Sequence, residues 1–344
     1  MASPKILRGQ FYALAAMAAW STNYVLGRAL RDEISPATLS AFRALVAGIP
    51  LVLWLLATRG WPRAPRPVAG RLMVLGFFGV FASPYQTYLA LHFSLATNVT
   101  ILTAASPIVT AVMAVAAGVT PFSRSLFAGL GISTAGAALI TALGASGGVA
   151  VHMDPGALLV IGSMITWAFY NIGVQRLSGD LPPLAITGGA MLTGFLFLLG
   201  ALGAERPPHL MLEVRTHLPV LFYLAIVPSA VGYILWNAAV RDIGAGHAMI
   251  FNNTLPIFGM LLGGLMLHEP ITVVQLLASA FIITGILLAM HTVAPADRPI
   301  RRDANARLTT GRRSGSVQLL KRSCCSTHAE RPRDDARAPK GFMR

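Results

Sequence analysis

The sequence predicts an all-α polytopic membrane protein with ten transmembrane helices that form two inverted five-helix repeats. Of its 344 residues, 55% are hydrophobic and 12% are charged, whereas soluble globular proteins carry about 25% charged residues. A pattern of small and polar residues, a proline, an apolar run and a second proline occurs at residues 96–121 and again at 245–270. Residues 16–20 and 163–167, which both end in tryptophan, form a second similar pair. The offsets of 149 and 147 positions indicate an internal duplication.

Ten runs long enough to cross a membrane follow one another along the chain. A spanning helix needs about 20 mostly apolar residues, and its backbone polar groups must bond within the helix because lipid offers them no partners. The first run follows Lys5 and Arg8, as in a signal peptide, but it continues through Trp20 to Leu26, so we expect a retained helix. The predicted spans are residues 9–27, 36–57, 71–91, 96–117, 125–143, 156–175, 184–203, 218–240, 246–267 and 271–291.

The duplication divides the chain into four parts. The first repeat covers residues 8–143, a Gly-rich linker covers 144–155, and the second repeat covers 156–292. Each repeat has an odd number of helices, so the second copy enters the membrane from the opposite side to the first. Such inverted repeats occur in secondary transporters, whose sites lie near the membrane midplane. Residues 293–344 hold 13 Lys and Arg against 5 Asp and Glu without apolar periodicity, which predicts a disordered basic tail.

The distribution of basic residues predicts the orientation. With the N-terminus inside, nine Lys and Arg lie in cytoplasmic segments and four in outer segments, and cytoplasmic loops are normally the basic ones. Both termini and the tail are therefore expected in the cytoplasm. The ratio of 24 Arg to 3 Lys favours a bacterial source, and thus the inner membrane. The net charge of +14 belongs to the loops and the tail, so nucleic acid is not an expected partner.

Neither a metal site nor a redox centre is expected. The two cysteines, Cys324 and Cys325, are adjacent in the tail, and vicinal cysteines rarely bridge each other. The sequence also lacks the spaced Cys and His pattern of a metal site. We therefore predict a protein without a cofactor.

Uncharged polar and aromatic residues occur within five of the predicted spans. Taken singly, such residues are typical of interfacial aromatic belts and of interhelical hydrogen bonds. Together they come from corresponding helices of both repeats, which favours a central substrate cavity. A spacing of three or four residues places Trp20 with Asn23, and Trp167 with Asn171, on one helix face. The candidate cavity residues are Trp20, Asn23, Tyr24, Tyr85, Gln86, Tyr88, Trp167, Tyr170, Asn171, Tyr233, Trp236, Asn237, Asn252 and Asn253.

Prolines and ionisable residues mark further positions in or beside the spans. Pro107 and Pro256 fall mid-span and are expected to kink the fourth and ninth helices, as hinges or as packing details. Arg43 lies about two turns inside the second span, and we interpret it as a structural anchor that reaches the outer interface, in preference to a ligand-binding residue. Glu269 and His247, near helix ends, are the candidates for proton coupling, and facilitated exchange is the alternative.

Five segments carry a resemblance to a known family. They read AAWSTNYVLGR, PATLSAFRALVAG and SPIVTAVMA in the first half, and TWAFYNIGVQR and LPIFGMLLGGLMLHEP in the second. In this order they resemble the EamA-type ten-helix members of the drug/metabolite transporter superfamily, over residues 8–292. One departure is the segment GVTP at residues 118–121, where the family usually has a Gly-Glu pair after the fourth span. Only Glu269, in the second half, keeps that glutamate.

The resemblance implies an inner-membrane carrier, commonly an exporter, of small metabolites such as amino acids or their derivatives. Secondary transport by alternating access is therefore the predicted function. The alternative is a polytopic membrane enzyme with an intramembrane active site, but residues 1–292 offer almost no carboxylates or histidines that could pair as acid and base. An ion channel would show charged rings or filter sequences, and the sequence has neither. The expected partners are a small-molecule substrate and the lipid bilayer, with a second copy of the chain in a homodimer as a further candidate.

Overall fold

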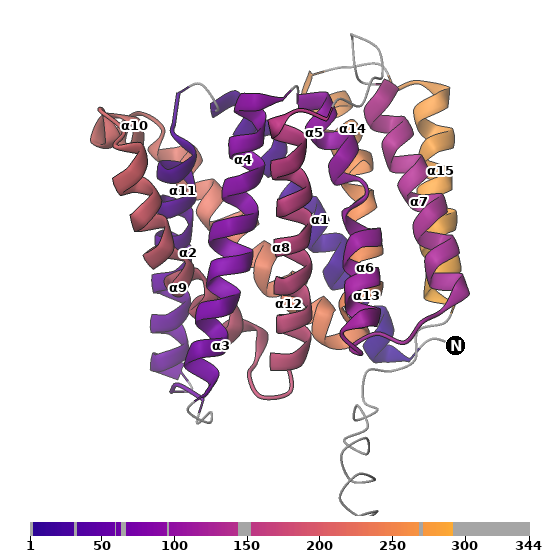
Figure 1. Ribbon diagram of the computed structural model, residues 1–344, viewed down its shortest axis with the longest axis horizontal. Coiled ribbons are helices and arrows are strands. Elements are labelled where there is room, and N and C mark those ends of the chain that lie inside the picture. Colours follow the sequence, from indigo (N-terminus) through magenta and orange to yellow (C-terminus); the bar gives the residue numbers. More distant parts are fainter. Residues whose placement is uncertain are drawn as a thin grey trace, which may run out of the picture. The chain divides into compact units, whose positions relative to one another are not determined.

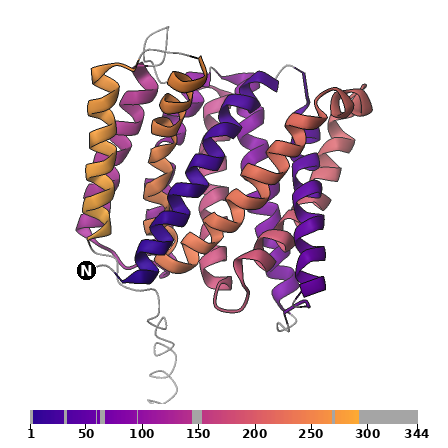
Figure 2. The same cartoon turned by 180° about the vertical axis from the view of Figure 1, so that it is seen from behind.

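A computed structural model describes residues 3–30, 33–58, 60–62, 67–94, 96–143, 153–267 and 271–291. Helices are the only regular elements of these residues (Figure 1, and from behind in Figure 2). Among them η1 and η2 are π-helices and η3 is a 3₁₀-helix. In chain order the elements are α1 (Pro4–Leu30), α2 (Pro36–Thr58), α3 (Pro67–Leu75), η1 (Gly76–Ala82), α4 (Ser83–Phe93), α5 (Ala96–Thr103), α6 (Ser106–Ala116), α7 (Arg124–Leu143), α8 (Pro155–Leu177), α9 (Pro183–Glu205), α10 (Leu210–Thr216), α11 (Leu218–Leu224), η2 (Ala225–Val231), α12 (Gly232–Ile243), α13 (Ala245–Ala248), η3 (Met249–Thr254), α14 (Leu255–Leu267) and α15 (Val273–Met290).

Eight helical segments of the described residues are long and apolar enough to cross a membrane, which confirms a multi-pass, all-helical membrane protein. They coincide with eight of the ten predicted spans. The other two, the first and the ninth, correspond to α1 and to the run from α13 to α14. The eight segments are Pro36–Thr58, Val68–Phe93, Asn98–Ala116, Arg124–Ala142, Pro155–Leu177, Pro183–Glu205, Leu218–Ile243 and Val273–Met290. The predicted tail and most of the predicted linker lie outside the described residues.

Prolines and polar caps begin several of these helices. Helices α2, α8 and α9 each start with a proline, at a position where the missing N–H costs no intrahelical hydrogen bond. The Asp154 carboxylate caps α8 by accepting a 2.8 Å hydrogen bond from the backbone N–H of Ala157. Thr272 and Gln275 form a reciprocal capping box at the start of α15. Gly244 ends α12 with a φ of 84°, which an L-residue with a side chain rarely adopts.

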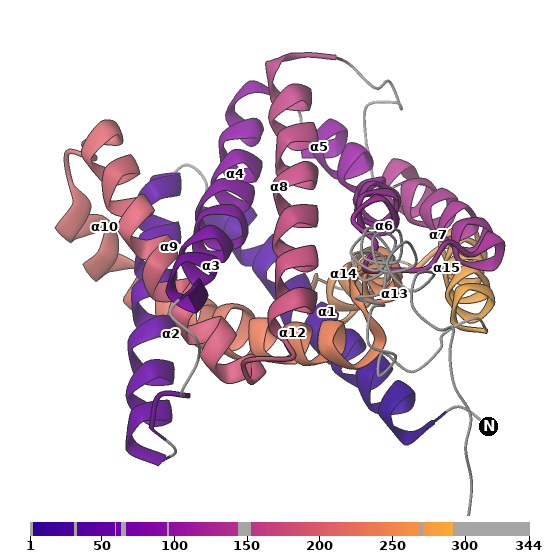
Figure 3. The same ribbon diagram turned by 60° about the horizontal axis from the view of Figure 1, so that its bottom comes forward.

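Four helix pairs run alongside each other: α1 with α12, α2 with α9, α4 with α8, and α7 with α15. Figures 1 and 3 both place α7 beside α15 and α4 beside α8. Small residues allow the closest of these approaches. A Cβ atom on Gly129 would lie 2.4 Å from the carbonyl oxygen of Gly285, and one on Gly136 would lie 2.7 Å from that of Ala278. Small residues at helix interfaces are typical of membrane proteins, because close packing holds helices together where lipid is as apolar as they are.

The third and eighth predicted spans each contain a π-helical segment. In the first half η1 joins α3 to α4, and in the second η2 joins α11 to α12. The two segments have seven residues each and start 149 positions apart. The same offset separates the repeated segments 96–121 and 245–270 of the sequence. π-helical turns occur frequently at functional sites. Nothing in the sequence predicted a π-helix at either segment.

The α-helices of the fourth and ninth predicted spans are interrupted just before their prolines. Helix α5 ends at Thr103 and α6 begins at Ser106, with Pro107 in its first turn. Similarly, η3 precedes α14, whose second residue is Pro256. A proline ring clashes with the carbonyl group four residues earlier and lacks an N–H, so a helix stops before it and restarts with the proline near its first position. About one turn before each proline the helix therefore changes: α5 and α6 are separated, and η3 gives way directly to α14.

Candidate substrate-binding site

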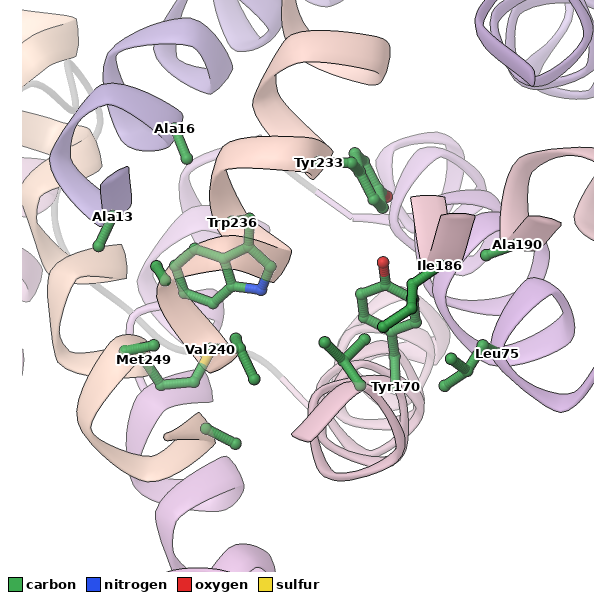
Figure 4. Packing of buried hydrophobic residues seen from close by; sticks show 14 of the residues in the cluster. Ala13, Ala16, Leu75, Tyr170, Ile186, Ala190, Tyr233, Trp236, Val240 and Met249 are labelled. Atoms are coloured by element: carbon green, nitrogen blue, oxygen red, sulfur yellow. The ribbon is translucent and has the colours of Figure 1, made fainter. Parts of the chain in front are cut away.

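Five aromatic rings from three helices form the centre of the candidate site, here called the aromatic cluster. Trp20 comes from α1, Trp167 and Tyr170 from α8, and Tyr233 and Trp236 from α12. Their neighbouring ring centroids lie 5.0–6.2 Å apart, within the range of favourable edge-to-face and offset-stacked pairs. Figure 4 shows Trp236 between α1 and the rings of Tyr170 and Tyr233. The structure thus brings together candidate residues from both halves of the chain.

The rings of the cluster differ in exposure. Tyr170 and Trp236 are fully buried, Tyr233 is 8% exposed and Trp20 is 9% exposed. Trp167 is the half-buried member. Of these five rings, Trp167 therefore offers the most surface to a ligand.

The two π-helical segments supply hydrogen-bond acceptors to the cluster. The indole Nε1 of Trp20 donates to the carbonyl oxygen of Pro228 in η2, at 2.8 Å. The hydroxyl of Tyr233 donates to the carbonyl oxygen of Gly79 in η1, at 3.0 Å. Gly79 and Pro228 are 149 positions apart, so they occupy equivalent places in the two halves. Buried indole and phenol groups need such partners, and the equivalent carbonyl groups of Pro228 and Gly79 provide them.

Gly79 also brings a ring close to the backbone. A Cβ atom at this position would lie 2.1 Å from the ring of Tyr170, far inside the contact distance of about 3.5–4.0 Å between carbon atoms. Any residue with a side chain at position 79 would therefore displace Tyr170 from the cluster.

Two predicted cavity residues, Asn171 and Asn237, support the cluster from inside the helix bundle. Both are fully buried. The Asn171 Oδ1 atom accepts a 2.7 Å hydrogen bond from Nε1 of Trp236, while its Nδ2 donates to the carbonyl oxygen of Trp167 at 2.8 Å. This arrangement orients the rings, and it leaves the amide of Asn171 turned toward the protein.

Asn237 holds the other side of the cluster in the same manner. Its Oδ1 accepts a hydrogen bond from the hydroxyl of Tyr170 at 3.0 Å, and its Nδ2 donates to Oγ1 of Thr187 on α9 at 2.9 Å. These contacts link α8, α12 and α9. A buried polar group with satisfied hydrogen bonds specifies one arrangement of its neighbours, so both asparagines act as supports in this structure.

A second group of predicted residues surrounds Arg43. The Arg43 Nε donates to Oγ of Ser229 at 2.9 Å, and its Nη1 donates to the hydroxyl of Tyr88 at 2.7 Å. Asn23 lies at the long end of hydrogen-bond distance from Tyr88, with its Nδ2 3.4 Å from the hydroxyl. Asn23, Tyr88, Arg43 and Ser229 are named the Arg43 group below. Arg43 thus donates hydrogen bonds to residues of two other membrane segments, α4 and η2. The interpretation of Arg43 as an anchor at the outer interface did not predict these contacts.

Three other predicted cavity residues, Tyr85, Gln86 and Asn253, contact groups outside the five rings of the aromatic cluster. The ring of Tyr85 stacks on Phe81, with centroids 5.6 Å apart, and Oε1 of Gln86 lies 3.4 Å from the hydroxyl of Thr166. Asn253 is buried and its Nδ2 donates to Ser133 on α7 at 2.8 Å. Asn252 is half-buried in η3, and the side chain of Tyr24 lies outside the described part of the chain.

Of the two candidates for proton coupling, His247 and Glu269, the structure describes only His247. It lies in α13 with 5% exposure, and its buried Nε2 has no hydrogen-bond partner among the described residues. Glu269 lies outside the described residues. Within the described part of the chain, His, Cys, Asp and Glu form no group of three or more that could hold a metal ion.

An apolar pocket of about 310 Å³ lies between α1, η3, α14 and α15. Its lining contains none of the predicted cavity residues, so it is distinct from the aromatic cluster. The lining residues are Leu14, Phe251, Thr254, Ile257, Phe258, Ile283, Ile286 and Leu287.

Gln175, a residue the sequence did not single out, connects the two halves near the end of α8. Its Nε2 donates to the carbonyl oxygen of Val119, just beyond α6, and its Oε1 accepts from the backbone N–H of Ala245 at the start of α13, both at 2.7 Å. This Gln175 bridge joins the interrupted fourth and ninth spans through one side chain. Only the folded structure could identify it, because a glutamine near a helix end is unremarkable in a sequence.

Beside this bridge a fully buried carboxylate, Asp242, pairs with two arginines. Its Oδ2 lies 2.8 Å from Nε of Arg8, and its Oδ1 lies 3.3 Å from Nε of Arg241. The hydrogen bond from Arg8, together with the attraction between the two charges, raises the pKa of the Arg8 guanidinium above its usual value. The pair fastens the start of α1 to the end of α12.

Comparison with known proteins shows similarity over both halves. The sequence matches the EamA-like transporter family twice, at residues 7–142 and at residues 154–290. A solved crystal structure covers 83% of this chain and 97% of its own, with a TM-score of 0.69 at 18% identity, which supports the fold alone.

Three relatives illustrate the range of similar proteins. The transporter YetK of Bacillus subtilis is 26% identical over 82% of this chain and 87% of its own length. A Salmonella typhimurium protein named "Probable amino-acid metabolite efflux pump" is 23% identical over 81% of this chain and 93% of its own. The biotin transporter of Escherichia coli is 31% identical, but over only 34% of this chain and 40% of its own. Because the family match covers most of both halves, the chain belongs to the EamA-like transporter family.

Proposed function

We propose that this protein is a secondary transporter that exports small metabolites, such as amino acids or their derivatives, by alternating access across the bacterial inner membrane. Ten helices in two inverted repeats form the carrier, with both termini in the cytoplasm. The observation that carries the proposal is the pair of family matches, together with interruptions at equivalent places in the two halves. Family membership favours a transporter over the intramembrane enzyme that the sequence left as an alternative.

The repeated interruptions support two structurally equivalent halves. Segments η1 and η2 start 149 positions apart, and so do α6 and α14, and α7 and α15. Within the interrupted spans, Pro107 and Pro256 lie at the same offset. Helices that break at matched points are the discontinuous elements typical of transporter sites. We assign the two prolines to hinges that move as the carrier changes state.

The helix pairing supports a two-fold relation between the halves. If the second half were exchanged with the first, the pair α1 with α12 would become α8 with α4, and both pairs are present. The pairs α2 with α9 and α7 with α15 would each map onto themselves. An odd number of spans in each half then requires opposite orientations in the membrane, as in inverted-repeat carriers.

The aromatic cluster supports a site for a small molecule with an apolar part. It lies where α1, α8 and α12 meet, and thus between the two halves. Binding sites of small ligands are usually lined by aromatic residues with a few placed polar groups. The half-buried ring of Trp167 supplies apolar surface, while Asn23, Tyr88 and Gln86 are half-buried polar groups on α1 and α4.

Reconstituted liposomes test the proposal. We expect purified protein to catalyse counterflow of at least one labelled compound from a panel of neutral amino acids and their derivatives, above the rate of protein-free liposomes. An untargeted comparison of metabolites excreted by deletion and overexpression strains would supply further panel members. Absence of counterflow for the whole panel, with chemical conversion of a lipid or a peptide, would contradict the transporter and favour the enzyme.

A further inference from the structure

Arg43 places a positive charge inside a membrane-spanning helix. It is the eighth residue of α2, which corresponds to about 10 Å along the helix axis from its first residue. Its partners come from other segments, Tyr88 from α4 and Ser229 from η2. An ionisable residue at such a depth is costly and usually serves a function.

The described part of the chain supplies no carboxylate that pairs with Arg43. Near the start of α2 three carboxylates among the described residues bind other groups. Glu33 pairs with His217 at 2.9 Å, Glu205 accepts from the backbone N–H of Ala37 at 3.2 Å, and Glu213 accepts from that of Ser35 at 3.3 Å. Both atoms that bind the Arg43 guanidinium belong to hydroxyl groups, so hydrogen bonds hold the charge, and no anion among the described residues compensates it.

The geometry leaves part of the guanidinium available. Its Nε and Nη1 are bound, whereas Nη2 has no partner within the described residues. Ser229 is itself fixed, because its hydroxyl donates to the carbonyl oxygen of Leu224 at 2.8 Å. A guanidinium fork that is held on one side presents donors suited to the two oxygens of a carboxylate.

Two short connections join the Arg43 group to the aromatic cluster. Ser229, which binds Arg43, follows Pro228, whose carbonyl oxygen binds Trp20. On α1, Asn23 lies three residues after Trp20 and therefore on the same face. The cation and the aromatic rings consequently border the same region between α1, α4 and η2.

We propose that Arg43 binds the carboxylate of the transported molecule, and that the substrates are small monocarboxylates with an apolar or aromatic group. This inference rests on the proposed transport function and names its substrate class. The carboxylate compensates the charge of Arg43, and the apolar group lies against Trp167 and Trp20. Tyr88 and Ser229 are positioning residues that hold the guanidinium.

Two probes that share a phenyl ring on a three-carbon chain, one ending in a carboxylate and one in an uncharged hydroxyl group, test this assignment. We would titrate the purified protein with 3-phenylpropanoate and with 3-phenylpropanol, using intrinsic tryptophan fluorescence, and measure inhibition of counterflow by each. The acid is expected to bind at least about tenfold more tightly than the alcohol. Arg43→Gln should weaken binding of the acid about 30-fold and leave the alcohol unchanged, because it removes one partner of a desolvated charge pair.

Arg71→Gln is the matched control, since Arg71 is 55% exposed and pairs with Asp180 at the far end of the span that carries Tyr88. It should change neither affinity. If Arg43→Gln fails to fold, Tyr88→Phe and Ser229→Ala provide the second test. Each keeps the positive charge but removes a hydrogen bond that positions the guanidinium. Each should therefore weaken binding of the acid and leave binding of the alcohol unchanged.

Equal wild-type affinities for the acid and the alcohol, or no binding of either, would overturn the assignment of Arg43. So would an Arg43→Gln protein that binds the acid as the wild type does. These results leave the transport proposal standing if counterflow of another panel compound is observed. Absence of counterflow for the whole panel contradicts the transporter itself.

Discussion

At the scale of single residues, exposure separates the rings that can touch a substrate from those that hold the site. Trp167 is half-buried, whereas Trp236 is fully buried and donates its Nε1 hydrogen bond to Asn171. The two tryptophans lie 6.2 Å apart between ring centroids. Substituting each of them in turn can therefore separate an effect on substrate binding from an effect on protein stability.

Substitution of these two tryptophans should give different outcomes. Trp167→Ala is expected to lower the apparent substrate affinity in counterflow about tenfold, or by about 1.4 kcal/mol of binding free energy, with a modest loss of stability. Trp236→Ala should destabilise the protein by about 3–5 kcal/mol, because it opens a cavity and leaves the Oδ1 atom of Asn171 without its donor. Thermal unfolding in detergent and counterflow at matched protein amounts would measure both effects. Equal losses of stability in the two variants would contradict this division.

At the scale of helices, the contacts between helix ends bear on how the carrier changes state. Gln175 binds the backbone at Val119, just beyond the fourth span, and at Ala245, where the run from α13 to α14 begins. If the fourth and ninth spans separate at this end of the bundle during alternating access, at least one of the two hydrogen bonds must break. The Gln175 bridge is therefore expected to favour the closed arrangement.

Removal of the Gln175 bridge should make the nearby backbone accessible. Each of its two hydrogen bonds contributes about 0.5–1.5 kcal/mol, so Gln175→Ala is expected to raise the open population about tenfold. The reporter is Thr120→Cys, at a buried position next to Val119, in a chain that also carries Cys324→Ser and Cys325→Ser. Labelling with a membrane-impermeant maleimide in inside-out vesicles should become faster. Gln86→Ala serves as the control, and equal labelling rates with and without Gln175 would count against the bridge.

The interface of α7 and α15 offers a prediction about helix packing. A Cβ atom on Gly129 would collide with the backbone of α15 at Gly285, whereas one on Gly131, two residues further along α7, would meet nothing within 4 Å. Gly129→Ala should therefore reduce the folded fraction in detergent, measured by size-exclusion chromatography after heating. Gly131→Ala should behave as the wild type or be slightly more stable, since alanine favours helix over glycine by about 1 kcal/mol. Comparable behaviour of the two variants would refute the close approach.

At the scale of the whole molecule, the two halves contribute jointly to every part of the candidate site. The aromatic cluster combines α1 with α8 and α12, the Arg43 group combines α1, α2 and α4 with η2, and the Gln175 bridge joins α8 to segments of both halves. Inverted repeats would explain this organisation, because both copies then meet at a shared axis near the membrane midplane.

Reporter fusions test the orientation of the halves. A reporter placed after His291 is expected to be cytoplasmic, and one placed between Arg206 and His209, just beyond α9, should be periplasmic. The reason is the excess of basic residues in the segments assigned to the cytoplasm. Phosphatase and fluorescent-protein fusions give opposite signals on the two sides and would serve as mutual controls. A cytoplasmic signal from the position after α9 would exclude the ten-helix inverted arrangement.

Composition and local pattern were sufficient to predict the class of the protein. Long apolar runs with few charges must form helices in lipid, and the repeated segments around Pro107 and Pro256 indicated the duplication. The membership in a transporter family followed from short motifs in a defined order. Even so, the sequence did not predict the helix interruptions just before the two prolines, which arise because a proline terminates the preceding helix and suits the first turn of the next.

The tertiary structure alone decided which polar residues face one another. Asn171 and Arg43 were both visible in the sequence, but their roles depend on Trp236 and Ser229, which lie 65 and 186 positions away. The π-helical segments, which supply the carbonyl oxygens of Gly79 and Pro228, had no local signal. Hydropathy and helical periodicity report on one helix and its solvent. The partners of a side chain in the interior depend on how separate helices pack, and that information is not local to any stretch of the chain.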